Sequence, residues 1–361
     1  MGERDEIWAF IGTYTQGESE GIYLYRLDAE TGAMEPMGLA ARTENPSYLA
    51  MHPNGHYLYA VNEVGEFEGQ PGGAVSAFAL TESGRLEYLN SQPTGGAAPC
   101  YVISDPTGRF VLAANYGGGS VCAMPVRDDG HLIEPTAIVQ HEGGSWGTPQ
   151  RQAGPHAHSV VMGPEGRFVF VADLGLDRIM VYQLEFDSGR LVPNDPSWTT
   201  LAQGAGPRHL VFHPNRLYAY VINELDSTIT TFSYDESRGS LETIQIVPTL
   251  PDDYEGKNSC ADIHLAPSGR FLYGSNRGHD SIAIFAVDGT SGRLTPHGHA
   301  STQGRVPRNF AVTPDGRHVL VANQDSDSIA TLRVDTETGD LVETGLAVEV
   351  PSPVCVRLLV R

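Results

Sequence analysis

Six titratable or charged side chains recur at two fixed distances from short turns that contain proline. Three of them stand six residues before a turn proline, and three stand ten residues after one. In chain order the six are Glu63, His158, Arg208, Glu224, Arg277 and Arg308. Carboxylates and histidines can exchange a proton, and arginines bind carboxylate and phosphate groups through two parallel hydrogen bonds. Together these residue types indicate acid–base chemistry on a small anion.

The turn prolines mark an internal repeat of about 50 residues, and a repeat of this length strongly limits the possible folds. They are Pro53, Pro106, Pro164, Pro214, Pro267 and Pro314. A short apolar run precedes each turn, and an alternating run such as RFVFVAD follows it, which is typical of a β-strand. A third strand-like run, a glycine turn and a weaker fourth strand come next. Four strands in a repeat of this length predict the blade of a β-propeller.

The two ends of the chain supply one further blade between them. The N-terminal runs IWAFIGTY, GIYLYRLD and TGAMEPM form a unit without a first strand, and SPVCVRLLVR at the C-terminus has the pattern of a first strand alone. Pairing them closes the ring and removes exposed sheet edges. We therefore predict an all-β, seven-bladed propeller of four-stranded antiparallel blades, with residues 1–361 as a single domain. A linear solenoid, the alternative, leaves both half-units unpaired.

The irregular connections of this propeller are predicted to lie on one face. Residues 64–73 connect a second strand with a third, and residues 142–154 and 248–259 connect successive blades. The other turns are short and nearly uniform. Variable connections on a regular scaffold mark a functional face. The six side chains are expected on this face, at the mouth of the central channel.

Comparison between the repeats separates structural positions from functional ones. The residue nine places after each turn proline is always Asn or Asp, which fits a turn that bonds its own backbone. The next residue varies, so the fold does not require a carboxylate at Glu224. Simpler roles remain open: a hydrogen bond from His158 to a loop carbonyl, and pairing of Arg208 and Arg277 with Glu224. Pairing does not prevent an arginine from binding an anion.

Further polar residues lie next to these positions. A structural role is predicted for His156, His209 and His264, and Asp262 is an additional candidate near the mouth. The mixture of arginines and carboxylates argues against a bound cation, because a metal site gathers several His, Asp or Glu ligands. We expect neither a metal nor a cofactor.

Composition limits the partners and the compartment. The formal charge is −21, from 23 basic and 44 acidic residues, which disfavours nucleic acid and anionic membranes as partners. The four cysteines are widely spaced and the N-terminus lacks the apolar run of a signal peptide. No stretch approaches the ~20 apolar residues of a membrane span. These features predict a reduced, cytoplasmic protein that is a monomer or a weak homodimer.

Several motifs resemble the lactonase family of seven-bladed propellers along essentially the whole chain. They are GAGPRHLVFHPN, AYVINELDSTI, ADIHLAPSGRFLYGSNRG, PHAHSVVMGPEGRFVFVADLGLDRIMVY and VPRNFAVTPDGR. That family includes bacterial 6-phosphogluconolactonases and a fungal carboxymuconate-lactonizing enzyme. The resemblance implies a site made of His158 in HAHS, Arg208 in GPRH, Glu224 in NEL and Arg277 in SNRG.

The resemblance implies a carboxylic-ester hydrolase that opens a small anionic sugar lactone. The expected substrate is 6-phosphogluconolactone, in the pentose phosphate pathway of glucose metabolism. Glu224 is then the candidate general base, and His158 protonates the leaving oxygen or shares the base role. Arg208 and Arg277 hold the substrate anion or the developing oxyanion.

Two further residues are expected at the site, and three alternative functions remain open. Arg308 is expected to extend the anion site, and Glu63 to contact substrate. The alternatives are a lactonase for non-phosphorylated sugar lactones, a carboxymuconate-type cyclase, and a propeller that binds a partner without catalysis.

Overall fold

The last strand of the chain completes the sheet that the first strand begins. In the computed structural model, which describes residues 6–361, β30 (Pro353–Val360) pairs antiparallel with β1 (Ile7–Thr13). The register runs from Ile7 opposite Val360 to Thr13 opposite Pro353, with a shift between Gly12 and Thr13. The pairing confirms the ring closure predicted from the two half-units.

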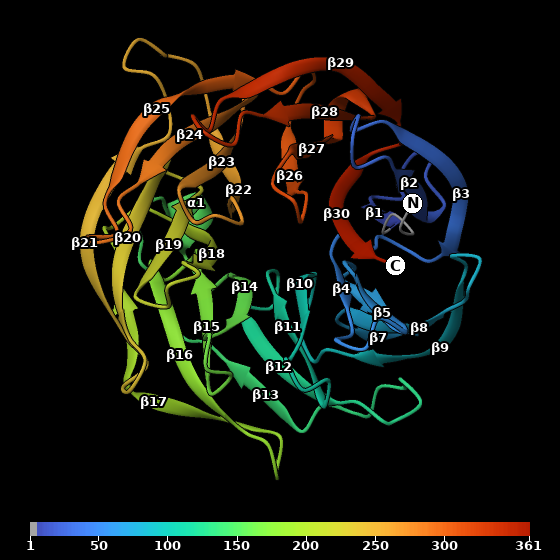
Figure 1. Cartoon of the computed structure of the whole chain (residues 1–361). Coiled ribbons are helices and arrows are strands. Elements are labelled where there is room, and N and C mark those ends of the chain that lie inside the picture. Colours follow the sequence, from blue (N-terminus) through green and yellow to red (C-terminus); the bar gives the residue numbers. More distant parts are fainter. Residues whose placement is uncertain (1–5) are drawn as a thin grey trace.

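Seven four-stranded antiparallel sheets surround a central axis (Figure 1). The sheet closed by β30 continues from β1 through β2 (Gly21–Leu27) and β3 (Met34–Arg42). The second sheet comprises β4 (Leu49–Met51), β5 (Tyr57–Asn62), β8 (Ala74–Leu80) and β9 (Leu86–Pro93). The third comprises β10 (Pro99–Ser104), β11 (Phe110–Asn115), β12 (Ser120–Pro125) and β13 (Ala137–Gln140). The fourth comprises β14 (Ala157–Met162), β15 (Phe168–Asp173), β16 (Arg178–Glu185) and β17 (Arg190–Thr200).

The remaining three sheets repeat the same order of strands. The fifth comprises β18 (Pro207–Phe212), β19 (Tyr218–Asn223), β20 (Thr228–Asp235) and β21 (Ser240–Pro248). The sixth comprises β22 (Ser259–Leu265), β23 (Phe271–Arg277), β24 (Ser281–Val287) and β25 (Leu294–Ser301). The seventh comprises β26 (Pro307–Val312), β27 (His318–Asn323), β28 (Ser328–Val334) and β29 (Leu341–Glu349). The all-β, seven-bladed propeller predicted from the repeat is confirmed.

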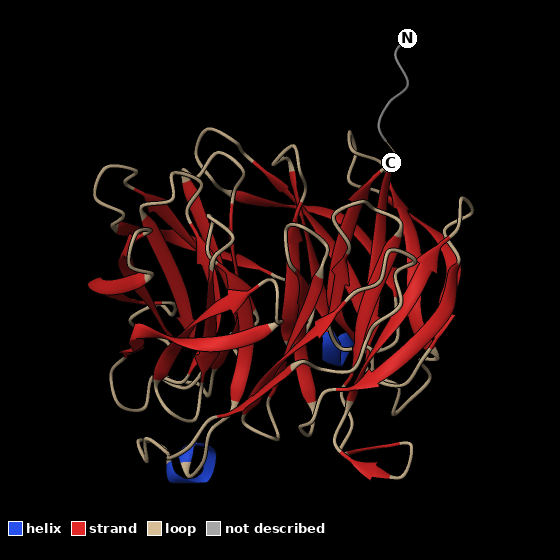
Figure 2. Ribbon diagram, turned by 90° about the horizontal axis from the view of Figure 1, so that it is seen from below, coloured by secondary structure: helices blue, strands red, loops and turns tan. Residues whose placement is uncertain are grey.

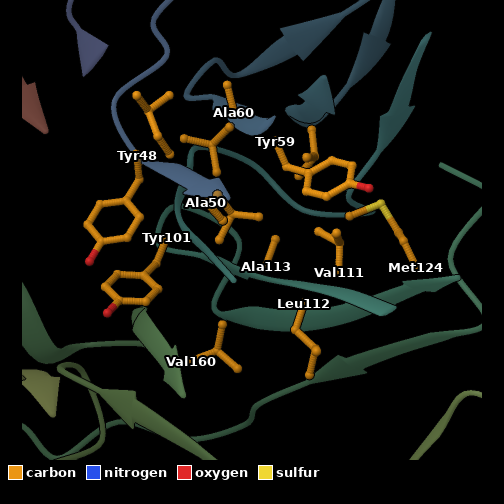
Figure 3. Close-up of a cluster of buried hydrophobic side chains, with 14 of the residues drawn as sticks. Tyr48, Ala50, Tyr59, Ala60, Tyr101, Val111, Leu112, Ala113, Met124 and Val160 are labelled. Atoms are coloured by element: carbon orange, nitrogen blue, oxygen red, sulfur yellow. The ribbon is translucent and has the colours of Figure 1, made fainter. Parts of the chain in front are cut away.

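The hydrophobic core lies between neighbouring blades. Each inner strand contacts the inner strands on both sides, as β22 contacts β18 and β26. Between the second and third blades, the buried side chains of Tyr59 and Met124 lie in one cluster, and the rings of Tyr48 and Tyr101 stack at 3.9 Å (Figure 3). Second strands such as β19 are buried on both faces, because they are covered by a blade on each side.

The repeated Asn or Asp positions are structural, as predicted, but their partners differ. Asp173 Oδ1 accepts from the amides of Gly175 and Leu176, so this residue does bond its own turn. Asn276 and Asn323 instead donate to carbonyls in the connection from the preceding blade, at 2.9 Å in each case. These side chains therefore fix the links between blades.

The irregular connections project from one face of the ring (Figure 2). The short helix α1 (Pro149–Gln152) and the hairpin of β6 (Glu66–Phe67) and β7 (Gln70–Pro71) lie on this face, while the C-terminus lies on the other. The other short helix is η1 (Gln324–Ser326). Within residues 6–361 the structure contains no helix of the length and apolar character needed to cross a bilayer.

Candidate active site

Glu224 is placed by the two motifs that flank the first hairpin of the fifth blade. It directly follows β19, and its amide donates to the carbonyl of Gly206 at 2.7 Å. Gly206 has a φ of 65°, where a Cβ would lie 2.5 Å from the side chain of Leu225. Glycine accommodates both the left-handed backbone and this close contact in the turn that leads into β18. Pro207 pairs with Asn223, and the register shifts between Pro207 and His209. The side chain of Arg208, at this irregularity, reaches Glu224.

Three arginines hold the Glu224 carboxylate, whose side chain is only 5% exposed. Arg208 donates from Nε to Oε2 at 3.1 Å. Arg277, at the end of β23, places Nη2 2.9 Å from the same oxygen. Arg151 of α1 donates from Nη2 to Oε1 at 2.6 Å. The buried carboxylate thus has an excess of positive charge around it.

This surplus of positive charge determines the ionisation of Glu224. Burial alone raises the pKa of a carboxyl group, but Arg277, Arg208 and Arg151 outweigh that effect and lower the pKa of Glu224 to about 2. Burial lowers the pKa of Arg277 to about 10. At neutral pH Glu224 is therefore a carboxylate and Arg277 a cation.

His158, in β14, contributes a buried imidazole on the other side of Glu224. Its Nε2 lies 4.0 Å from Oε2 of Glu224, and its Nδ1 lies 3.6 Å from Sγ of Cys100. Burial, together with nearby Arg208, holds the pKa of His158 well below its usual range. The imidazole is therefore neutral at pH 7, with one nitrogen able to donate and the other to accept.

A second polar cluster contains Arg308 and Glu63. Arg308 donates from Nη2 to the hydroxyl of Tyr14 at 2.8 Å, and that hydroxyl donates to Oε2 of Glu63 at 3.0 Å. Ser47 also donates to this carboxylate oxygen. Within residues 6–361 Arg308 forms no ion pair, so its positive charge remains available to an anion.

A cavity of about 250 Å³ brings the two clusters together. Five of the six predicted residues line it, together with four others. The lining is Glu63, Cys100, Tyr116, Arg151, His158, Glu224, Ser259, Arg277 and Arg308. The sixth predicted residue, Arg208, borders an adjoining narrow hollow and reaches Glu224 from there.

Arg151 is the functional candidate that the sequence comparison missed. It lies in the irregular segment 142–154, a connection between blades whose sequence is not repeated in the other blades. The helix that carries it is anchored by the next residue, because Gln152 is buried and donates from Nε2 to Asp177 Oδ1 at 2.7 Å and to Leu174 O at 2.8 Å. In the sequence, only the predicted location of this segment on the functional face indicated that it could contribute to the site.

The histidines with a predicted structural role lie outside the cavity. His209 pairs through Nδ1 with Oδ1 of Asp262 at 2.7 Å, and its Nε2 faces Nη1 of Arg208 at 3.1 Å. His264 reaches Oδ2 of the same aspartate at 2.9 Å. His156 stacks on Tyr116 at 4.6 Å. Asp262 therefore fixes the orientation of His209, and His209 in turn contacts the guanidinium of Arg208.

No metal centre is suggested by the described part of the chain. Residues 6–361 contain no cluster of three or more His, Cys, Asp or Glu side chains arranged to hold a metal ion. The charged groups that converge on Glu224 are arginines, which repel cations. This chemistry fits an anionic ligand.

Comparisons with known proteins agree with this reading of the fold and the motifs. The model of the family described as "Lactonase, 7-bladed beta-propeller" matches residues 8–358. The chain is 39% identical over 351 residues to the 6-phosphogluconolactonase of Bacillus subtilis (strain 168), which covers 97% of each protein. A 6-phosphogluconolactonase of Formosa agariphila is 33% identical over 308 residues, 84% of this chain and 85% of that protein.

A solved structure shows the same similarity in three dimensions. The periplasmic gluconolactonase of Pseudomonas aeruginosa matches with a TM-score of 0.92 and 37% identity, over 98% of this chain and 99% of that one. Family model, relatives and structure agree along nearly the whole sequence. The chain therefore belongs to the lactonase family of seven-bladed β-propellers, as its motifs predicted.

Proposed function

We propose that the protein hydrolyses a sugar-acid lactone, with 6-phosphogluconolactone as substrate and 6-phosphogluconate as product. The observation that carries this proposal is the cavity in which a buried carboxylate, Glu224, meets Arg151, Arg277 and Arg308. Such a cavity suits a small anion with an electrophilic carbonyl. The two relatives named 6-phosphogluconolactonase support the choice of lactone.

The reaction requires three catalytic functions from the site: a general base, a general acid and a group that stabilises the oxyanion. The oxygen of a water molecule forms a bond with the lactone carbonyl carbon, and the bond from that carbon to the ring oxygen breaks. A base takes a proton from the water, and an acid gives one to the departing ring oxygen. A donor stabilises the negative charge that develops on the carbonyl oxygen. The carboxylic acid product then ionises and releases one proton.

Side chains of the described residues can supply each of these catalytic functions. Glu224 is the proposed base, and neutral His158, with Nε2 4.0 Å from it, is the proposed proton donor or second base. Arg277 lines the cavity next to Glu224 and is proposed to stabilise the oxyanion. Arg308, which has no ion pair within residues 6–361, is proposed to bind the substrate anion. Glu63 holds the Tyr14 hydroxyl that Arg308 contacts.

A non-phosphorylated sugar lactone is the second candidate substrate. The observation that favours it is the similarity to the Pseudomonas aeruginosa gluconolactonase, at 37% identity over nearly the whole chain. The ring-opening chemistry is the same for both lactones. They differ in whether a phosphate must be bound.

The test is a lactone-disappearance assay at controlled pH, corrected for the spontaneous rate. Wild type should accelerate opening of 6-phosphogluconolactone, and Glu224→Gln should lower kcat by about 10²–10⁴-fold with little change in KM. Arg208→Ala should also weaken substrate binding. Turnover that is unchanged in Glu224→Gln would remove this residue as the base. Absence of acceleration by wild type on both lactones would refute the proposed function.

The proposed setting follows from the same substrate. We place the protein in the cytoplasm, in carbohydrate metabolism, as a monomer or weak homodimer without nucleic-acid or membrane partners. The net charge of −21 supports the last point. Cell fractionation and sedimentation measurements test compartment and oligomeric state.

A further inference from the structure

The two oxygens of the Glu224 carboxylate have different partners. Oε2 faces two arginines, Arg208 at 3.1 Å and Arg277 at 2.9 Å. Oε1 accepts from Arg151 at 2.6 Å, and this is its only hydrogen bond from an arginine within residues 6–361. Removal of one guanidinium would therefore free one oxygen of the carboxylate and leave the other held in place.

Arg151 is also the most accessible of the three arginines. Its side chain is 39% exposed, compared with 3% for Arg208 and 14% for Arg277. The same Nη2 atom also reaches the hydroxyl of Tyr116 at 3.0 Å, on the wall of the cavity. Because Gln152 anchors the helix, the backbone of Arg151 is fixed and its long side chain is the part that can move.

The free protein holds Glu224 in a form that is unsuited to proton abstraction. Both carboxylate oxygens are occupied by arginines, and the pKa of about 2 makes the group a weak base. A water molecule that approaches the lactone carbonyl needs an oxygen that can accept its proton. A change in the arginine contacts on substrate binding would supply one.

We propose that Arg151 couples the base, Glu224, to an anionic substrate. The phosphate of a bound sugar lactone binds the Arg151 guanidinium, which then leaves Glu224, and Oε1 of Glu224 becomes free. The inference rests on the proposed lactonase function and adds a specificity-determining residue to it. Arg151 also acts as a positioning residue, because its effect on proton transfer passes through Glu224.

Phosphate is well suited to this exchange. A guanidinium binds a phosphate through two parallel hydrogen bonds, so an ion pair lost at Glu224 is replaced by one on the substrate. A neutral lactone offers no such replacement, and with it Arg151 remains on Oε1. The exchange therefore favours phosphorylated lactones.

The first experiment compares two substrates in one variant. With 6-phosphogluconolactone, Arg151→Ala should lower kcat/KM by about 10–100-fold, the usual effect of losing a charged hydrogen bond. With gluconolactone, kcat/KM should rise above the wild-type value, because Oε1 is no longer covered. An equal loss on both substrates, or no loss on either, would overturn the proposal.

The pH profile tests the link to Glu224. Without the Arg151 charge, the pKa of Glu224 rises toward its ordinary range, so the acid limb of kcat/KM for gluconolactone should move to higher pH in Arg151→Ala. A limb that stays at the wild-type pH contradicts the link. Arg151→Lys, which keeps a charge but not the two-pronged geometry, should recover part of the preference for the phosphorylated substrate.

A matched control variant is available on the same face. Arg305 is exposed and donates to the carbonyl of Asp325 at 2.6 Å, and Arg305→Ala should leave both substrate preference and pH profile unchanged. A similar change in this variant would show that the effect of Arg151 is one of overall charge, and would overturn the proposal.

A binding measurement keeps the inference testable if the protein opens neither lactone. By calorimetry, Arg151→Ala should weaken binding of 6-phosphogluconate by about 10–100-fold and leave gluconate binding unchanged. Equal affinities of wild type and variant for 6-phosphogluconate would overturn the role of Arg151. Failure of the proposed function appears instead as inactivity of wild type.

Discussion

Arg277 and Glu224 belong to neighbouring blades, and Nη2 of the arginine lies 2.9 Å from Oε2 of the carboxylate. This ion pair is buried and crosses the boundary between the fifth and sixth sheets. The residues proposed to act on substrate therefore also join two units of the ring. Stability and activity are expected to respond together when either residue is changed.

Acid should destabilise the protein in part through Glu224. The pKa of this carboxyl is about 2 in the folded protein against an ordinary value of 4.5, so its stabilising effect is complete above about pH 4.5 and is lost as the pH falls toward 2. Between pH 5 and 2.5, wild type should lose roughly 2–3 kcal/mol more unfolding free energy than Glu224→Gln, measured in urea. Parallel pH dependences in the two proteins would contradict this.

Arg308 should affect substrate binding more than turnover. Its guanidinium contacts the Tyr14 hydroxyl rather than a carboxylate, so Arg308→Ala should raise KM for 6-phosphogluconolactone about 10–100-fold with a smaller change in kcat. Unlike Arg151→Ala, it should leave the acid limb of kcat/KM for gluconolactone in place. Steady-state kinetics beside Arg305→Ala test this, and an unchanged KM would exclude Arg308 from the anion site.

Ring closure should depend on the buried residues of β30. Val356 is 1% exposed in an apolar cluster with Ile7 and Ile11, and Val360 is 45% exposed on the same strand. Val356→Asp places an unpaired charge in the core and should cost several kcal/mol of unfolding free energy, whereas Val360→Asp should change it by about 0.5 kcal/mol or less. Thermal and urea unfolding of the two variants provide the comparison. Equal stability would mean that β30 contributes little to the ring.

The four cysteines should be free thiols that do not react in the native protein. All four are buried, and burial raises the pKa of the Cys122 and Cys260 thiols to about 12 and of Cys355 to about 11; the pKa of Cys100 rises as well. Ellman's reagent should find four reactive thiols after unfolding and almost none before. Rapid reaction of the native protein would show that the cavity beside Cys100 opens widely.

The repeat explains why most of the site could be predicted from the sequence. Equivalent positions in different blades face the same mouth, so Glu224 and Arg277 were recognisable because their counterparts differ. Neighbouring positions that are always Asn or Asp, such as Asn223, are recognisable as structural for the same reason. The pairing of Arg208 and Arg277 with Glu224, left open by the sequence as a simpler role, is observed in the structure.

The remaining features depend on tertiary structure. Arg151 lies in an irregular segment whose path is fixed by the contacts of Gln152 with Asp177 and Leu174, and no repeat position predicts those contacts. The pKa of Glu224 depends on how many guanidinium groups reach each carboxylate oxygen. Such contacts arise only after blades that are distant in sequence have packed.

The closure of the first blade by β30 has a consequence for biosynthesis. Six of the blades are continuous in sequence and can fold as they leave the ribosome, in line with the general tendency of early segments to fold first. The first blade cannot, because its inner strand, β30, is translated only after the other six blades. Until then β1 presents an open edge to the growing chain and to its neighbours. The growing chain is therefore most exposed to mispairing and to chaperone capture at β1, and this exposure lasts until β30 has been translated.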